Sequence, residues 1–220
     1  QVTVVGNGSA CVVGGHAYII KKGQRFITNS AIASMGYDLP AAIGAWTASR
    51  DKGCYSQGGD RSGDDLILVT GDGSMQMNLQ ELQTIIHHRM GIKIFVINNG
   101  GYHSIRQTQK NFFGEPLIGI GVDSGDLSFP ALDKLAAAYG YPYVSARHNS
   151  ELGEAVEKTL AAEGPVICEV FVSMDQNFEP KSSAKRLPDG TMVSPPLEDL
   201  SPFLPDEEMD ENMIIPRIRE

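Results

Sequence analysis

The sequence is poor in cysteine and in basic residues, and these shortages exclude several classes of protein. It has three cysteines, Cys11, Cys54 and Cys168, with no C-x-x-C pair. Such a sparse, odd set gives no zinc or iron–sulfur spacing and is typical of a reducing compartment. Eighteen Lys and Arg face 27 Asp and Glu, a net charge of −9, and no basic stripe is visible. Because a nucleic acid backbone binds to clustered cations, we expect no nucleic acid partner.

Long apolar segments are also missing. No run approaches the length of a membrane span, and the start of the chain lacks the charged and apolar regions of a signal peptide. We therefore predict no membrane partner and a cytoplasmic location. The chain opens at Gln1, inside an expected strand and without an initiator methionine, which favours a piece of a longer polypeptide. With 41% hydrophobic and 20% charged residues, its composition is that of a globular protein.

Short apolar runs alternate with helical segments through residues 1–175. This alternation predicts an α/β fold, a mostly parallel sheet flanked by helices on both faces. An exposed loop rich in Gly, Asp and Ser is expected at 51–65. The expected strands are 2–5, 25–28, 66–70, 92–97, 143–146 and 165–172, and the expected helices include one from Leu79 towards Gly91, one at 129–139, and one at 150–162 with Ser150 as its N-cap.

The last part of the chain, residues 176–220, differs in composition. It holds seven of the twelve prolines and is strongly acidic towards its end. So many prolines disfavour any regular element. We therefore predict a second region, a Pro-rich acidic C-terminal arm or lid, after a domain spanning 1–175.

Two polar turns follow neighbouring strands of the predicted sheet. Gly71-Asp72-Gly73-Ser74 ends the strand at 66–70, and Asn98-Asn99-Gly100-Gly101 ends the strand at 92–97. A crossover helix between parallel strands brings Asp72 and Asn99 to the same sheet edge. Their oxygens suit Mg²⁺, which also binds phosphates, and the adjacent glycines let backbone approach a phosphate. Either turn alone is more often a plain surface turn, but together they predict a metal and phosphate site.

The sequence GDGSMQMNLQEL, followed by INNGGY, resembles the diphosphate and metal motif of thiamine diphosphate (ThDP) enzymes. The resemblance is strongest to the acetolactate synthase and pyruvate decarboxylase group. The resemblance covers about residues 1–200 and implies the ThDP-binding fold, with 1–175 as the C-terminal diphosphate-binding domain. It implies Mg²⁺ held by Asp72, Asn99 and the main chain of Gly101. The cofactor-binding residues that it implies are Gly8, Ser9, Ala10, Ala33, Met35, Gly71, Asp72, Gly73, Ser74, Asn99, Gly101, Tyr102, His103 and Ser104.

The segment from Asn29 to Ala45 is similar to a second motif of these enzymes. By that resemblance Met35 is a wedge that bends the cofactor, and the Ala33 carbonyl accepts a hydrogen bond from its pyrimidine amino group. These two are the predicted catalytic residues. From the residues alone, a methionine here is more often a core filler.

The resemblance implies a ThDP-dependent, decarboxylating carboligase that acts on a 2-oxoacid, like an acetolactate synthase large subunit. It also implies a homodimer or homotetramer in which a partner subunit supplies a pyrimidine-binding domain, so the fragment alone should be inactive. FAD is possible in the full-length protein, but not on this domain. The alternatives are a ThDP-dependent 2-oxoacid decarboxylase subunit and a non-catalytic nucleotide- or metal-binding α/β module.

Residues 102–109 are expected to form a loop over the site. Ile105 stands where pyruvate decarboxylases carry a catalytic glutamate, and Thr108 stands where acetolactate synthases of branched-chain synthesis carry a tryptophan. The first departure argues against simple aldehyde release, and the second leaves the acceptor substrate open. His103 as an acid/base and Arg106 as an anchor for a substrate carboxylate are candidates, although loop residues of this kind are more often structural or solvated.

Overall fold

Six short apolar runs pair into one fully parallel sheet in the computed structural model, which describes residues 1–51 and 66–217. The strand order is β2-β1-β3-β4-β6-β5, so the crossover from β3 to β4 joins two central neighbours. Each strand lies within one residue of its predicted bounds, which confirms the expected α/β class. The strands are β1 (Val2–Val5), β2 (Arg25–Thr28), β3 (Leu66–Gly71), β4 (Ile92–Asn98), β5 (Tyr143–Ala146) and β6 (Val166–Phe171).

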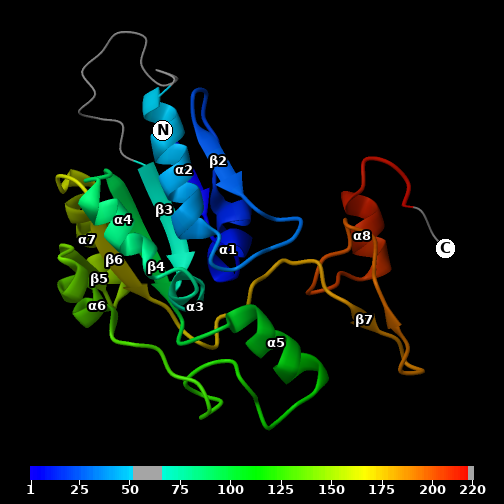
Figure 1. Ribbon diagram of the computed structural model, residues 1–220. Helices are drawn as coiled ribbons and strands as arrows, with labels where there is room; N and C mark the ends of the chain where they lie inside the picture. Colours follow the sequence, from blue (N-terminus) through cyan, green and yellow to red (C-terminus); the bar gives the residue numbers. More distant parts are fainter. Residues whose placement is uncertain (52–65, 218–220) are drawn as a thin grey trace. The chain divides into compact units, whose positions relative to one another are not determined.

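Helices cover both faces of the sheet (Figure 1). Apolar side chains of α2, α4 and α6 pack against one face, and α1 and α7 lie on the other. The one-turn helix α3 and the longer α5 follow the carboxyl ends of β3 and β4. The helices of this unit are α1 (Ser9–Ala17), α2 (Asp38–Asp51), α3 (Asp72–Gln76), α4 (Glu81–His87), α5 (His103–Phe112), α6 (Leu132–Tyr139) and α7 (Asn149–Ala161).

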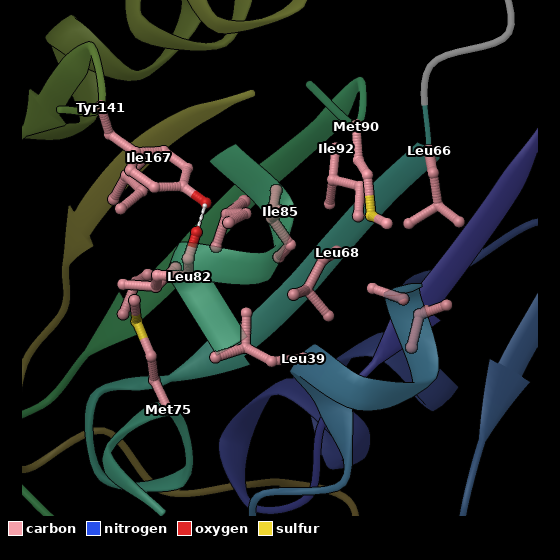
Figure 2. Packing of buried hydrophobic residues seen from close by; sticks show 14 of the residues in the cluster. Leu39, Leu66, Leu68, Met75, Leu82, Ile85, Met90, Ile92, Tyr141 and Ile167 are labelled. Atoms are coloured by element: carbon pink, nitrogen blue, oxygen red, sulfur yellow. Dashed lines mark hydrogen bonds between the residues drawn. The ribbon is translucent and has the colours of Figure 1, made fainter. Parts of the chain in front are cut away.

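The main core lies between the sheet and the α2, α4 and α6 layer. Figure 2 shows Leu39 of α2 facing Leu68 of β3, with Leu82 and Ile85 of α4 beside them, all fully buried. Tyr141 closes one side of this core, and its hydroxyl donates a hydrogen bond of 2.8 Å to the carbonyl oxygen of Leu82. The interior of β3 and β4 is therefore fixed by close packing, which sets the positions of the turns at their carboxyl ends.

Four local expectations were wrong. Residues 103–112 form the helix α5 rather than a loop. Helix α4 spans Glu81–His87, so it is shorter than the helix expected from Leu79 towards Gly91. Helix α6 begins at Leu132, three residues later than predicted. Helix α7 begins at Asn149 with His148 as N-cap instead of Ser150, because the Glu151 carboxylate accepts hydrogen bonds from the backbone N–H groups of Arg147 and His148.

The chain divides into two compact units, Gln1–Gln176 and Asn177–Glu220. The second unit contains an antiparallel pair, β7 (Lys185–Arg186) and β8 (Met192–Val193), and the helix α8 (Asp206–Asn212). The expectation of no regular element after 176 was therefore wrong, because the prolines lie between these elements rather than inside them.

The loop predicted at 51–65, and Cys54 within it, lie outside the described residues apart from Asp51 at the end of α2. Among the helices in the described part of the chain, none combines the length and apolarity needed to cross a membrane.

Candidate functional site

A small hollow lies at the carboxyl edge of the sheet, where the turns after β1, β3 and β4 meet. Helices α1, α3 and α5 all begin at this edge (Figure 1). It is also the edge at which open α/β sheets bind ligands. The residues that line the hollow are Asn7, Gly8, Ser9, Met35, Gly71, Asp72, Gly73, Ser74, Asn99, Gly101, Tyr102, His103, Ser104 and Ile105.

Asp72 is a buried carboxylate at the centre of this edge. Its Oδ1 accepts a hydrogen bond of 2.8 Å from the Gly73 N–H, and its Oδ2 accepts one of 2.9 Å from the Gly101 N–H. Burial raises the pKa of Asp72 to about 6, although hydrogen bonds from the backbone of Gly73, Gly101 and Gly100 oppose the rise. Since desolvation disfavours the ionised form, a cation at this carboxylate would offset that cost. The carboxylate still has lone pairs for a metal ion after both hydrogen bonds.

Asn99 lies across the same edge and is also buried. Its amide nitrogen donates a hydrogen bond of 2.6 Å to the hydroxyl oxygen of Ser9, at the start of α1. This bond uses one of the two amide N–H donors and leaves the amide oxygen as the atom that could bind a hard cation. The Gly101 carbonyl accepts a hydrogen bond from the His103 N–H and keeps a second lone pair. Asp72, Asn99 and Gly101 thus offer three oxygens of the type that Mg²⁺ prefers.

Glycines give the hollow its shape. Gly8 has a φ of 102°, and a Cβ there would meet no atom within 4 Å, so its absence keeps open space in front of the α1 N-terminus. A Cβ at Gly73 would lie 2.4 Å from the Tyr102 ring. Gly101 has a φ of 147°, and a Cβ there would lie 2.0 Å from the carbonyl oxygen of Ile120. The Gly73 and Gly101 N–H groups already donate to Asp72, so the part of the hollow that suits an anion is the open space at Gly8, in front of the start of α1.

The segment that carries Met35 is tied to this edge by hydrogen bonds. The Gly36 N–H donates to the Ser74 hydroxyl at 2.9 Å, and the Asn78 amide donates to the Gly36 carbonyl at 2.6 Å. On the other side, the Asn7 amide donates to the Ser34 carbonyl at 2.9 Å. Met35 itself is half-buried and lines the hollow. The segment is thus held by Asn7, in the turn after β1, and by Ser74, in the short helix after β3.

Ala33 adopts a left-handed backbone conformation, with a φ of 55°, while its side chain is exposed. A non-glycine residue in this conformation is strained, and such strain concentrates at functional sites.

No group of three or more His, Cys, Asp or Glu side chains able to hold a metal occurs in residues 1–51 and 66–217. The oxygens of this edge are therefore a mixed set of one carboxylate, one side-chain amide and one main-chain carbonyl.

The comparison with known families agrees with this geometry. Residues 6–170 match the family described as "Thiamine pyrophosphate enzyme, C-terminal TPP binding domain", where thiamine pyrophosphate (TPP) is another name for ThDP. The chain belongs to this family. Its sheet edge is therefore the edge of a TPP-binding domain, and the expected fold family is confirmed.

Three curated relatives of this TPP-binding domain are acetolactate synthases. The protein from Arthrospira platensis is 31% identical over 157 residues, and the large subunit from Cyanidium caldarium is 33% identical over 156, each covering 71% of this chain. The isozyme 2 large subunit of Escherichia coli K12 is 30% identical over 178 residues, or 81% of this chain. The matched segments make up 24%, 24% and 29% of those proteins, so the chain spans about a quarter of their length.

The TPP-binding domain brings the predicted site residues together, apart from Ala10 and Ala33. Ala10 is buried inside the first turn of α1, and Ala33 lies next to the hollow in sequence without lining it. Asn7 and Ile105 line the hollow and were not among the predicted residues. The sequence carried a signal for Asn7, because it sits between two glycines in a turn at a strand end. The resemblance also carried a signal for Ile105, because this residue stands where pyruvate decarboxylases carry a catalytic glutamate.

His103 and Arg106 of the TPP-binding domain are buried, with 4% and 1% of their surface exposed. Their side chains are held by protein groups: Arg106 binds Asp123, and the His103 Nε2 lies 2.7 Å from the Gln176 carbonyl oxygen. The structural reading of these two residues is therefore the better one, and the role of Arg106 as a substrate anchor does not fit this geometry.

Proposed function

We propose that the carboxyl edge of this sheet binds the diphosphate of ThDP through Mg²⁺, with Asp72, Asn99 and the Gly101 carbonyl as its protein ligands. We further propose that the domain serves a ThDP-dependent carboligase that decarboxylates a 2-oxoacid, as the names of its acetolactate synthase relatives suggest. The observation that carries the proposal is the direct 2.9 Å bond from the Gly101 N–H to Asp72, which joins the turns after β3 and β4 into one oxygen-lined site.

The residues present fit the cofactor. The open space at Gly8 leaves room for phosphate oxygens beside the N–H groups of Gly8, Ser9, Ala10 and Ser74, and a diphosphate there would face the first turn of α1. Gly73 would contribute by the absence of a side chain, because its N–H already donates to Asp72. The Asp72 carboxylate alone would repel that diphosphate. A divalent cation held by Asp72, Asn99 and the Gly101 carbonyl would offset that repulsion. Gly71, Tyr102, His103 and Ser104 complete the wall of the hollow.

When bound, ThDP supplies the carbanion chemistry that removes CO₂ from a 2-oxoacid. This chain holds and orients the cofactor. Met35 would act as the apolar wedge that bends it, and the Ala33 carbonyl would accept a hydrogen bond from its amino group. The left-handed φ of Ala33 supports this role, because strained backbone conformations concentrate at functional sites.

We propose the remaining parts of the active enzyme from its resemblance to the family. A pyrimidine-binding domain, supplied by a partner subunit of a homodimer or homotetramer, completes the cofactor site. Residues 176–220 serve as an arm or lid. The free cysteines Cys11 and Cys168 fit a reducing compartment such as the cytoplasm.

A calorimetric titration of the purified chain tests the binding proposal. The ligands are ThDP, thiamine monophosphate as a control that lacks the second phosphate, and NAD, each with and without Mg²⁺. We expect binding of ThDP that depends on Mg²⁺, with little binding of the monophosphate or of NAD. Binding of NAD in preference to ThDP would support the non-catalytic nucleotide module instead, a reading that the first turn disfavours because Gly6-Asn7-Gly8-Ser9-Ala10-Cys11 lacks the third glycine of a dinucleotide motif.

An activity assay tests the reaction and the missing partner. The chain with saturating ThDP and Mg²⁺ should neither decarboxylate pyruvate nor form acetolactate, because it lacks the glutamate that a pyrimidine-binding domain contributes. Adding that domain from a related enzyme, or the longer protein, should produce 2-oxoacid consumption. Substantial turnover by the chain alone would overturn the half-site assignment.

A further inference from the structure

The turn after β4, which carries the proposed metal ligands Asn99 and Gly101, is held from behind by one buried arginine. Arg106, on the first turns of α5, donates from Nη1 to the Asn99 carbonyl at 3.2 Å and from Nη2 to the Gly100 carbonyl at 3.1 Å. Both carbonyls belong to the turn itself. The guanidinium thus fixes two successive peptide groups next to the site.

The other donors of Arg106 are also used. Nε and Nη2 bind the two carboxylate oxygens of Asp123 at 2.8 and 2.9 Å, a bidentate pair. Nη1 lies 3.2 Å from His103 Nδ1. A guanidinium has five N–H donors, and this arrangement engages all of them. Arg106 is 1% exposed, and its buried positive charge is compensated by the Asp123 carboxylate, which is 23% exposed, and by oriented carbonyls.

The segment around Gly121 lies close against the same turn. Gly101 and Gly121 form an antiparallel bridge, and the Val122 N–H donates to the Gly100 carbonyl at 3.2 Å. A Cβ at Gly121 would lie 2.1 Å from the Gly100 carbonyl oxygen and 2.9 Å from Arg106 Nη2. Gly121 therefore leaves the space that the guanidinium and the turn occupy, while Asp123, two residues on, neutralises the charge.

We propose that Arg106 is the positioning residue of the metal site: with Asp123 it locks the 99–101 turn in the conformation that presents the Asn99 amide and the Gly101 carbonyl to Mg²⁺. The inference rests on the proposed function for the identity of the ligand. It assigns Arg106 no contact with substrate, because its donors are already engaged.

The same guanidinium sets the tautomer of His103. Arg106 has no acceptor atom, so the contact at 3.2 Å requires an unprotonated His103 Nδ1. The ring proton then lies on Nε2, which donates to the Gln176 carbonyl at 2.7 Å. His103 lines the hollow, so Arg106 determines which ring nitrogen of this imidazole carries the proton.

The test compares Mg²⁺ affinity among three variants in the presence of saturating ThDP. In Arg106→Met the turn loses its two carbonyl clamps, and we expect the Kd of Mg²⁺ to rise by about tenfold or more, as for other residues that orient metal ligands. Arg106→Lys should be weakened as well, because an ammonium has only three donors and no fork. The matched control is Arg147→Met, which removes an exposed arginine that packs on Phe171 near the same sheet edge and should leave the Kd unchanged.

Chemical rescue separates positioning from general loss of structure. Methylguanidinium added to Arg106→Gly should lower the Kd of Mg²⁺ towards the wild-type value, and ethylammonium should not. A wild-type Kd in Arg106→Met, or equal effects in the Arg147 control, would overturn the proposal.

A third measurement needs neither a variant nor the cofactor. ¹⁵N NMR of wild-type protein with labelled histidine should show His103 with an unprotonated Nδ1 and a protonated Nε2. The opposite tautomer would overturn the Arg106 assignment even if ThDP binds. Absence of Mg²⁺-dependent ThDP binding by the wild type, with the expected tautomer present, would instead reject the proposed function and leave the arginine clamp standing.

Discussion

Both ends of β4 carry buried polar side chains, but the two ends use them in opposite ways. At the amino end, Lys93 is fully buried, and its ammonium group donates to the carbonyl oxygens of Ala162 and Gly164, just after α7. At the carboxyl end, Asn99 lies beside Asp72 in the wall of a hollow. The first group completes a helix end, and the second faces open space. Burial of a polar group therefore does not mark a functional site; a site is marked by polar groups that converge on a cavity.

The largest effect should come from removing the charge at the carboxyl end. Asp72→Ala should weaken Mg²⁺-dependent ThDP binding by more than about 100-fold, because it removes the single carboxylate among the proposed ligands. The ligand-free protein should melt near the wild-type temperature, since the lost hydrogen bonds are offset by the removal of a desolvated carboxylate. Calorimetry and thermal unfolding measure the two quantities. Unchanged ThDP affinity would remove Asp72 from the site.

The amino end should show the reverse behaviour. Lys93→Met keeps the length of the side chain but leaves the Ala162 and Gly164 carbonyls without their donor, which should lower the free energy of unfolding by about 1–3 kcal/mol. ThDP affinity, measured well below the melting temperature, should not change. Urea unfolding followed by circular dichroism gives the first value. A loss of ThDP affinity in this variant would mean that the two ends of β4 are coupled.

A smaller effect is expected at the wedge. Met35→Ala should lower turnover roughly tenfold while the Kd of ThDP stays close to wild type, because the change loosens the orientation of the cofactor rather than its diphosphate contacts. The assay requires the assembly that includes a pyrimidine-binding domain. Met77, which is exposed on the turn after α3, provides a matched methionine control. Equal turnover in Met35→Ala and in the parent would make Met35 an ordinary packing residue.

The smallest effect concerns acid. Hydrogen bonding to Arg106 lowers the pKa of Asp123 below its ordinary value. A carboxyl whose pKa is lower in the folded than in the unfolded state stabilises the fold above its unfolded pKa of about 4, and this stability is lost as the pH falls through the folded pKa. Wild-type stability should therefore fall more steeply below about pH 4 than that of Asp123→Asn. Parallel curves in acid titrations of the two proteins would contradict the strength of this pair.

Much of the fold was predictable because its strands are continuous apolar runs that a sheet buries on both faces. Leu66 to Val69 and Ile92 to Ile97 are short, mainly apolar runs typical of buried parallel strands, and a crossover between them brings Asp72 and Asn99 to one sheet edge. The resemblance to ThDP enzymes then supplied the assignment to the family. These features depend on local sequence and on one crossover.

What could not be predicted depends on contacts between distant residues. The α5 segment carries Ser104, Gln107 and Gln109 among few apolar residues, which obscured a helix whose buried side is polar. The clamp on the turn joins Arg106 to Asp123, and no sequence pattern predicts that these two residues pair. In the second unit, helix α8 follows Pro205, which is compatible with a helix start, but the density of prolines concealed it.

The central claim is that one metal ion joins Asp72 and Asn99 to the cofactor diphosphate, and ³¹P NMR with Mn²⁺ in place of Mg²⁺ tests it most directly. A paramagnetic ion bound between this sheet edge and the diphosphate should broaden both phosphorus signals of protein-bound ThDP strongly. In Asp72→Ala, measured at ThDP concentrations that still give a bound fraction, the protein-dependent broadening should disappear. The same broadening in wild type and variant would contradict the account, because the metal would then reach the diphosphate without the carboxylate on which this site is built.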